Sequence, residues 1–422
     1  MIKGSALYLS VIISLVITLI CGSIILIAHT YNLQYKKQER MQRLQNNLSS
    51  GMTVIMDHNF PLDSAVNTSL FEITNDSIRL EKKRWGIYQV GLVKAWVNKD
   101  SLGKAFLLGF KLKDSLQVLF LADQGRPLTI SGKTKIIGTA YLPQSGVKAG
   151  YVDTLGYTDK TLVYGLVKKS KQSLPELDRI TLTYIRSLLT ENIKSGSSQI
   201  IRVEAGGLAN DDTTNSFFNP CLKVHLKKNA SDLSSKSITG NVIVFSDTTI
   251  TVGHDSKLDK AILIAPYVSI QPGFKGVVQV IASDSITLGN RVELSYPSAL
   301  LLLKNDSAKH QVKIRIGKDC KIEGQLLAYQ KDQEVLMPVI EIGAKTIIAG
   351  ELYSTGYIAL ARSARVNGSL TASRFMARTS ESIYENYLID VKLDRLELSR
   401  YYLGTKLFNS DAIQSHVLCW LN

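Results

Sequence analysis

The sequence has few cysteines, four in 422 residues, and none of them forms a C-x-x-C pair. This excludes a disulfide-built scaffold and provides no zinc or iron–sulfur ligand set. The six histidines show no metal-ligand spacing, and the phosphate-binding and nucleophile patterns GxxxxGK[ST], GxGxxG after a strand and G-x-S-x-G are absent. We therefore predict no catalytic residues, no cofactor and no metal, and a protein that is not an enzyme.

Proline is also scarce, with nine residues against 29 glycines, which suits a turn-rich β protein. Charged residues make up 20% and hydrophobic residues 45%, a globular balance that excludes a disordered or collagen-like chain. The net charge of +14 is spread out, and no nucleic-acid signature accompanies it. The densest basic positions, which could favour an anionic polysaccharide or DNA or could form a solvated surface, are Lys168, Lys169, Lys171, Lys227 and Lys228.

One stretch has no charge at all, from Ala6 to Ala28. Its 23 residues suffice to cross a hydrocarbon core, which takes about 20 residues as a helix. The stretch is longer than the apolar core of a secretory signal and lacks an A-x-A-like site. We predict a retained transmembrane helix in a lipid bilayer, followed by a polar helical stem that ends near Asn47, before Ser49-Ser50-Gly51.

The flanking charges leave the orientation open. Lys3 precedes the span, whereas Lys36, Lys37, Arg40 and Arg43 follow it. A literal positive-inside count would place the large C-terminal part in the cytoplasm.

The leader MIKG, followed by SALYLSVIISLVITL, resembles a type IV minor pilin or type II secretion pseudopilin. The resemblance implies cleavage after Gly4, with Ser5 as the new N-terminus. Leu9 stands where major pilins carry glutamate, as is typical of a tip subunit in that family. It further implies other pilus-like or envelope subunits as partners, and an inner-membrane protein whose C-terminal part lies outside the cytoplasm, in the periplasm or at the cell surface.

Asp-Ser/Thr-apolar triplets are more frequent than composition predicts. The triplet resembles the O-glycosylation acceptor of exported Bacteroidota proteins, although Asp-Ser also favours turns that lead into strands. The central residues are Ser64, Ser77, Ser101, Ser115, Thr154, Thr213, Thr248, Ser285 and Ser307.

An internal repeat dominates residues 239–375. An apolar residue recurs at intervals of 18, or of 26 and 28 where loops are inserted, with another apolar residue six positions on and glycine nearby. An earlier unit lies around Ile130 and is expected to stack on the later block. The repeat predicts a triangular β-solenoid that resembles hexapeptide-type and bactofilin-like β-helices, with a β-sandwich as the alternative. The predicted core positions are Ile130, Val252, Ile270, Leu288, Ile316, Ile342 and Leu360.

The expected fold is thus mainly β. It comprises a membrane anchor and stem (1–47), a small β-rich head (48–125), a first coil with a helical and loop excursion (126–238), the solenoid (239–375) and a C-terminal cap (376–422). The excursion contains a helix over 172–195, which starts at Pro175. Its apolar face is Leu177, Ile180, Tyr184 and Leu188.

Few side chains are candidates for chemistry. Glu323, Glu341 and Glu351 are expected at solvated positions, the last two on different sides, and His254 and His310 at the surface. The sequence favours an exported structural or adhesive envelope component. The alternatives are a cytoplasm-facing bactofilin-like scaffold and an envelope polysaccharide-active enzyme on a β-helix.

Overall fold

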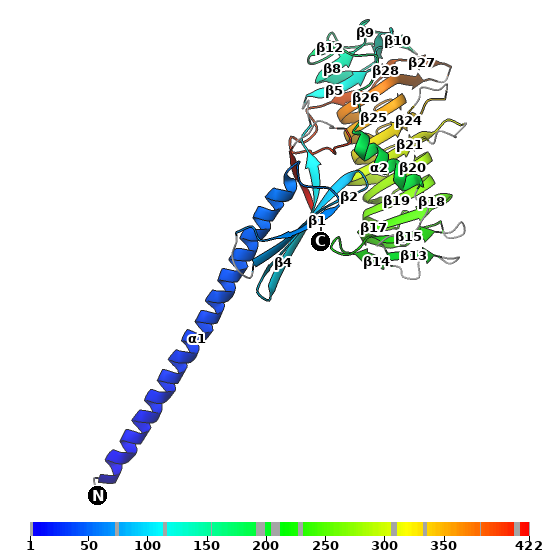
Figure 1. Ribbon diagram of the computed structural model, residues 1–422. Coiled ribbons are helices and arrows are strands. Elements are labelled where there is room, and N and C mark those ends of the chain that lie inside the picture. Colours follow the sequence, from blue (N-terminus) through cyan, green and yellow to red (C-terminus); the bar gives the residue numbers. More distant parts are fainter. Residues whose placement is uncertain are drawn as a thin grey trace. The chain divides into compact units, whose positions relative to one another are not determined.

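The computed structural model (Figure 1) describes residues 3–71, 76–112, 116–152, 154–190, 199–203, 212–226, 231–304, 310–331, 336–379, 381–408 and 414–421. The predictions of a mainly β chain and of one long apolar N-terminal helix are confirmed. Contacts divide the chain into two compact units. The first comprises Met1–Lys82 and Gly91–Lys104, and the second comprises Lys83–Val90 and Ala105–Asn422.

Helix α1 spans Lys3–Met56 and is long and apolar enough to cross a membrane. Every described side chain from residue 5 to residue 39 is exposed, as expected of a segment whose apolar surface meets no protein core. The helix continues through the predicted end at Asn47, so that prediction was wrong.

The last third of α1 has a buried face, and this face explains why the helix continues. Leu44, Leu48, Gly51 and Ile55 follow at helical spacing and are all buried. A Cβ atom on Gly51 would lie 2.5 Å from Ile78 Cδ1. Gly51 therefore serves a close approach between helix and sheet instead of ending the helix.

An antiparallel sheet has the strand order β1-β2-β3-β4-β30; β1 belongs to the first unit, and β30 with its β4 partners Ala105–Phe110 belongs to the second. The predicted head therefore takes its last strand from the far end of the sequence. The strands are β1 (Ser64–Thr68), β2 (Asp76–Trp85), β3 (Tyr88–Val97), β4 (Asp100–Phe110) and β30 (Ser415–Leu421).

Polar contacts fix α1 to β2 and β4. Arg43 binds the Asp76 carboxylate through two nitrogens, at 2.6 and 3.3 Å, and the Asn47 amide donates to it at 3.4 Å. Arg40 lies 2.6 Å from Asp100. The Asp76 side chain is 4% exposed and that of Asp100 is 40% exposed, so the two ion pairs differ mainly in burial.

We expect Asp76→Ala to lower the free energy of unfolding by about 2–3 kcal/mol, because Arg43 and Asn47 would lose a buried partner. Asp100→Ala removes an equal charge from an exposed pair and should cost at most about 1 kcal/mol. Thermal unfolding of the full chain in non-ionic detergent measures both. Similar melting temperatures for the two variants would contradict the buried role of Asp76.

The second unit is built around a parallel sheet that closes on itself, and Figure 1 shows its short strands stacked from β13 and β14 through β26 to β5 and β8. There are two smaller sheets: β10 and β11 form one, and the other has the strand order β28-β6-β9. The strands of the unit are β5 (Gln117–Leu121), β6 (Leu128–Ser131), β7 (Lys135–Ile137), β8 (Thr139–Leu142), β9 (Val147–Ala149), β10 (Tyr151–Val152), β11 (Leu155–Gly156), β12 (Val167–Lys169), β13 (Gln199–Val203), β14 (Asp212–Asn215), β15 (Leu222–Leu226), β16 (Ser237–Gly240), β17 (Val242–Ser246), β18 (Thr249–Val252), β19 (Lys257–Ile270), β20 (Lys275–Leu288), β21 (Glu293–Leu303), β22 (Lys313–Ile316), β23 (Lys321–Tyr329), β24 (Val339–Ile342), β25 (Ile347–Leu360), β26 (Arg365–Arg378), β27 (Ile383–Glu385), β28 (Tyr387–Ile389) and β29 (Lys392–Asp394).

The repeated apolar residues are register partners in this sheet. The pairs run in one column through Val252, Ile270, Leu288, Ile316, Ile342 and Leu360. None of these side chains is more than 8% exposed. The unequal intervals in the sequence thus correspond to equal steps in the sheet. The extra residues lie between β21 and β22 and between β23 and β24.

The earlier repeat unit pairs with the end of the later block. Strand β5 pairs with β26, β7 with β29 and β6 with β28, which places Ile130 opposite Leu388. The predicted cap over residues 376–422 is therefore wrong. Strand β29 lies between β26 and β7, and β30 pairs with β4. Lys392–Asp394 have strand partners on both sides, because the earlier repeat unit covers the edge that a cap would otherwise cover.

Helix α2 (Arg179–Thr190) is shorter than predicted, and residues 191–195 lie outside the described residues. Asp178 sets its start, because its carboxylate accepts hydrogen bonds from the Thr181 backbone N–H at 2.8 Å and from the Thr181 hydroxyl at 2.6 Å. Its buried face is Leu182, Ile185 and Leu188. The assignment of Ile180 to that face was wrong, since this side chain is 66% exposed.

Candidate functional site

The three glutamates lie in three different register columns. Glu323 pairs with Ala349, Glu341 with Ala359 and Glu351 with Ser369. Three separate columns do not provide the paired carboxylates that polysaccharide hydrolysis uses.

Two of the glutamates form surface ion pairs. Glu341 lies 3.0 Å from Arg315 and 3.5 Å from Arg378, and Glu323 lies 2.6 Å from Lys321. Glu351 instead is only 6% exposed, so the prediction of a solvated position was wrong for it.

Glu351 is buried because later parts of the chain cover this face of the sheet. It accepts a hydrogen bond from Gln325 Nε2 at 2.7 Å, and the Thr405 hydroxyl donates to Gln325 Oε1 at 2.7 Å. Burial raises the pKa of the Tyr88 and Tyr402 hydroxyls, and the negative charge of Glu351 raises the pKa of both further. The cluster is an enclosed polar layer outside the apolar core.

A second buried amide fixes the turn between β2 and β3 within the same unit. Gln279 Oε1 accepts from the Ile87 N–H at 2.9 Å, and its Nε2 donates to the Trp85 carbonyl at 3.3 Å. A Cβ atom on Gly86 would overlap the Gln279 side chain, so the turn needs glycine at this position. The Gln279 amide thus replaces a strand partner for two backbone groups that would otherwise be buried and unpaired.

The segment before α2 crosses the sheet and leaves a cavity on each side of it. The volumes are about 330 and 260 Å³, and Pro175, Glu176, Leu177 and Tyr353 line both. The Tyr353 hydroxyl donates to the Pro175 carbonyl at 2.9 Å and so holds the segment to the sheet.

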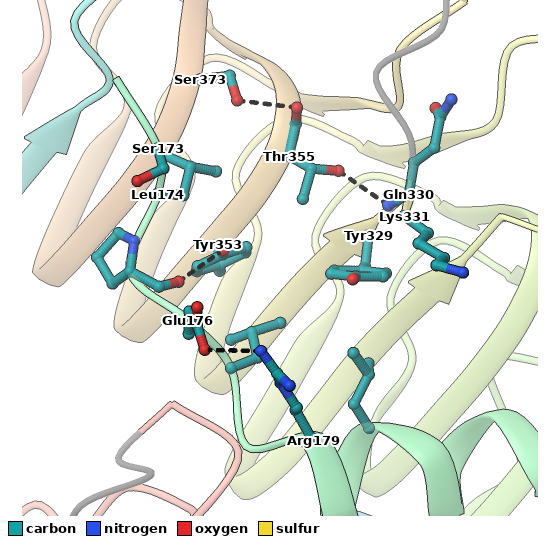
Figure 2. A pocket seen from close by; sticks show the side chains of 13 residues that line it. Ser173, Leu174, Glu176, Arg179, Tyr329, Gln330, Lys331, Tyr353, Thr355 and Ser373 are labelled. Carbon is teal, nitrogen blue, oxygen red and sulfur yellow. Dashed lines mark hydrogen bonds and ion pairs between the residues drawn. The ribbon is translucent and has the colours of Figure 1, made fainter. Parts of the chain in front are cut away.

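Figure 2 shows the larger cavity, where hydroxyl and aromatic groups from neighbouring strands approach the crossing segment. Ser373 donates to the Thr355 carbonyl at 2.9 Å, and Arg179 lies 3.4 Å from Glu176. Glu176 and Arg179 are paired with each other and highly exposed. The cavity offers polar contacts to a small ligand, but this arrangement provides no buried acid–base pair.

The predicted modification and processing residues lie on exposed or half-buried parts of the chain. Ser5 is exposed in the first turns of α1. Most of the triplets stand at or next to the start of a strand, which favours the turn interpretation of the pattern. Ser115 and Ser307 lie outside the described residues; the others, none of them buried, are Ser64, Ser77, Ser101, Thr154, Thr213, Thr248 and Ser285.

The histidines and cysteines form no ligand set. His310 lies 2.7 Å from Asp284, and His254 is exposed. Cys320 is buried, which raises the pKa of its thiol. Across the described residues, no group of three or more His, Cys, Asp or Glu side chains could hold a metal ion.

The structure brings together basic residues that the sequence shows as scattered. Lys168 and Lys169 lie on β12, which pairs with β8, and Lys227 and Lys228 lie outside the described residues. A larger set lies at one corner of the parallel sheet, that is, at the first residue of successive stacked strands or in the turn just before it. These residues, which we call the basic ridge, are Lys133, Lys135, Lys257, Lys275, Arg291, Lys318, Lys321, Lys345, Arg362, Arg365 and Lys392.

Sequence reasoning missed the basic ridge because its members on successive strands lie 16 or more residues apart or come from the earlier repeat unit. The signal was present, since most of them stand at fixed offsets from the repeated apolar residues. Lys318, for example, follows Ile316 by two positions, and Lys345 follows Ile342 by three.

Over the residues that the structure describes, the chain is mainly β and has one N-terminal helix long and apolar enough to span a bilayer. No protein-family model, curated protein or solved structure matches this chain.

Proposed function

We propose that this chain is a single-pass, membrane-anchored and exported structural or adhesive component of a bacterial envelope assembly, of the kind formed by pilin-like tip subunits. The observation that carries the proposal is α1 itself. The side chains of its apolar segment are exposed, and the same helix continues without interruption into a packed face at Leu44–Ile55. An anchor that is continuous with the folded part holds that part at a fixed distance from a bilayer.

The parallel sheet supplies the rigid part of the proposal. We interpret it as a three-sided β-solenoid in which strands from successive coils stack. The unbroken column from Val252 to Leu360 and the buried side chains along it support this interpretation. Such a stack presents long, regular outer faces to partners.

The exported orientation is proposed from the resemblance of the leader MIKG to pilin-like leaders and from the Asp-Ser/Thr-apolar triplets. The four basic residues that follow the span, taken alone, favour the cytoplasm-facing alternative.

Sidedness can be tested with the full chain carrying a reporter after Asn422. We expect alkaline phosphatase to be active and green fluorescent protein to be dark, because only the former folds productively outside the cytoplasm. The opposite pattern would favour the cytoplasm-facing, bactofilin-like scaffold.

We further expect the N-terminus to be processed after Gly4. Mass spectrometry of the membrane-extracted protein should find Ser5 as the first residue, since the short leader abuts an uninterrupted apolar helix. A Gly4→Leu variant is the matched control and should retain Met1. Met1 at the start of the unaltered protein would leave an ordinary signal anchor and remove the pilin-like part of the proposal.

A further inference from the structure

The basic ridge is continuous in register. One column of strand partners contains Lys275, Glu293, Lys321, Ile347, Arg365, Lys392 and Lys135 in this order. Lys257 extends it by one strand, because Lys257 and Lys275 each lie two positions before the register partners Asp259 and Val277. Neighbouring strands lie about 4.8 Å apart, so the seven steps from first to last extend over about 34 Å.

The turn residues two or three positions before each column residue, which form the corner of the sheet, add further cations. Backbone hydrogen bonds link successive corners, from the Arg291 N–H to the Lys318 carbonyl at 2.9 Å and from the Asp319 N–H to the Ala344 carbonyl at 3.0 Å. Where the column has Glu293 or Ile347, the corner supplies Arg291 or Lys345. We call each of the eight strands, together with the turn before it, a level of the ridge. Each level therefore carries one or two of the ridge cations.

Positive charge dominates the ridge even after its carboxylates are counted. Its eleven lysines and arginines stand against four acidic residues at the same column and corner positions, an excess of seven positive charges. The four are Asp255, Glu293, Asp319 and Asp390.

Some ridge cations are already paired and others are not. Lys275 lies 2.8 Å from Glu293, and Lys392 lies 2.9 Å from Asp394. Arg291, Lys318 and Lys345 are exposed and form no ion pair with any residue that the structure describes. These three occupy consecutive levels in the middle of the ridge.

We propose that the basic ridge binds an acidic polysaccharide, with the sugar chain laid along the stacking direction of the strands. A carboxylated polysaccharide is an extended chain that carries regularly spaced, single charges, which suits a line of single cations. This inference deepens the proposed adhesive role and rests on that proposal for the location of the polymer.

Other anionic polymers suit the ridge less well. Single-stranded nucleic acid binds through aromatic stacking as well as charge, and the ridge columns contain no aromatic residue. Duplex DNA carries a charge about every 1.7 Å of its axis. The four interspersed carboxylates would repel such a dense charge more than a sparse one.

The test measures binding of sodium polygalacturonate to the full chain in phosphatidylcholine nanodiscs at low salt. Arg291→Gln, Lys318→Gln and Lys345→Gln are combined in one variant. The matched control combines Lys148→Gln, Lys160→Gln and Lys169→Gln, which removes the same charge from other exposed positions. Neutral dextran, duplex DNA and phosphatidylglycerol vesicles are the comparison ligands.

We expect the ridge variant to bind polygalacturonate about tenfold more weakly, a loss of roughly 1.4 kcal/mol. The control should lose less than twofold, and binding of the unaltered chain should weaken steeply between 50 and ~300 mM salt as exposed charges are screened. Equal losses of affinity in both variants would mean that net charge alone determines the binding, which would overturn the inference. So would absence of binding, or ridge-dependent binding that is tighter for DNA or vesicles than for polygalacturonate. None of these outcomes depends on the reporter fusions, so the inference and the proposed function can fail separately.

Discussion

Replacing Ile316 with aspartate is expected to unfold the second unit. Ile316 is 2% exposed and lies in the column between Leu288 and Ile342, with apolar partners on both sides. A carboxylate there would be buried without a cation or a hydrogen-bond donor, which costs several kcal/mol and consumes most of the stability of an ordinary domain. Ile342→Asp should have the same effect, because Ile342 is 3% exposed and lies in the same column.

The matched control is Lys345→Glu, since Lys345 is exposed at the corner just after Ile342. This change should leave the melting temperature of the full chain in detergent nearly unaltered. The aspartate variants should be recovered as aggregates or should melt at least 10 °C lower, by roughly 2–4 °C for each kcal/mol lost. If all three variants melt together, the inward assignment of the column is wrong.

Gly350→Ala is expected to have the second-largest effect. The backbone of Gly350 has φ +152°, and an added Cβ would overlap the carbonyl oxygen of Gly324 on the neighbouring strand. Gly324 and Gly368 have the same conformation and the same close approach to their own neighbours. Alanine would both strain the backbone and push two paired strands apart, so we expect a loss of roughly 4 kcal/mol, at the upper end for single substitutions.

Gly125 provides the control because it also has positive φ, +72°, but an added Cβ would meet nothing within 4 Å. Gly125→Ala should therefore cost only the backbone strain, about 1 kcal/mol. Urea denaturation followed by tryptophan fluorescence, to which the buried Trp85 contributes, compares the two. Indistinguishable midpoints would show that the corner glycines are not required for strand stacking.

The sequence predicted best where one short-range rule decides the structure. The apolar residues from Val252 to Leu360 recur because each must fill the same inward position, and the charge-free run at Ala6–Ala28 needs no tertiary information. Gly51 shows the limit of local rules. It is a helix terminator by propensity, but packing against Ile78 determines its role here.

Long-range contacts account for the other differences. Glu351 is polar by sequence and lies on a strand, and it is buried by residues distant in the sequence, such as Tyr402 and the Thr405 that binds its partner Gln325. The basic ridge depends on aligning repeat units of unequal length with the earlier unit at Lys133 and Lys135. That alignment becomes visible only when strand register is known.

The exposed part of α1 also determines the distance between the end of the charge-free segment and the first contact of the helix with the sheet. Ala28 ends the charge-free segment, and Arg40 is the first residue of the helix with an ion pair to the sheet, twelve positions later. At 1.5 Å per residue this leaves a spacer of about 18 Å between the end of the apolar segment and the first folded contact. If the charge-free segment spans a bilayer, as we propose, this unbroken helical spacer would set how far the packed face at Leu44–Ile55 stands from the bilayer surface.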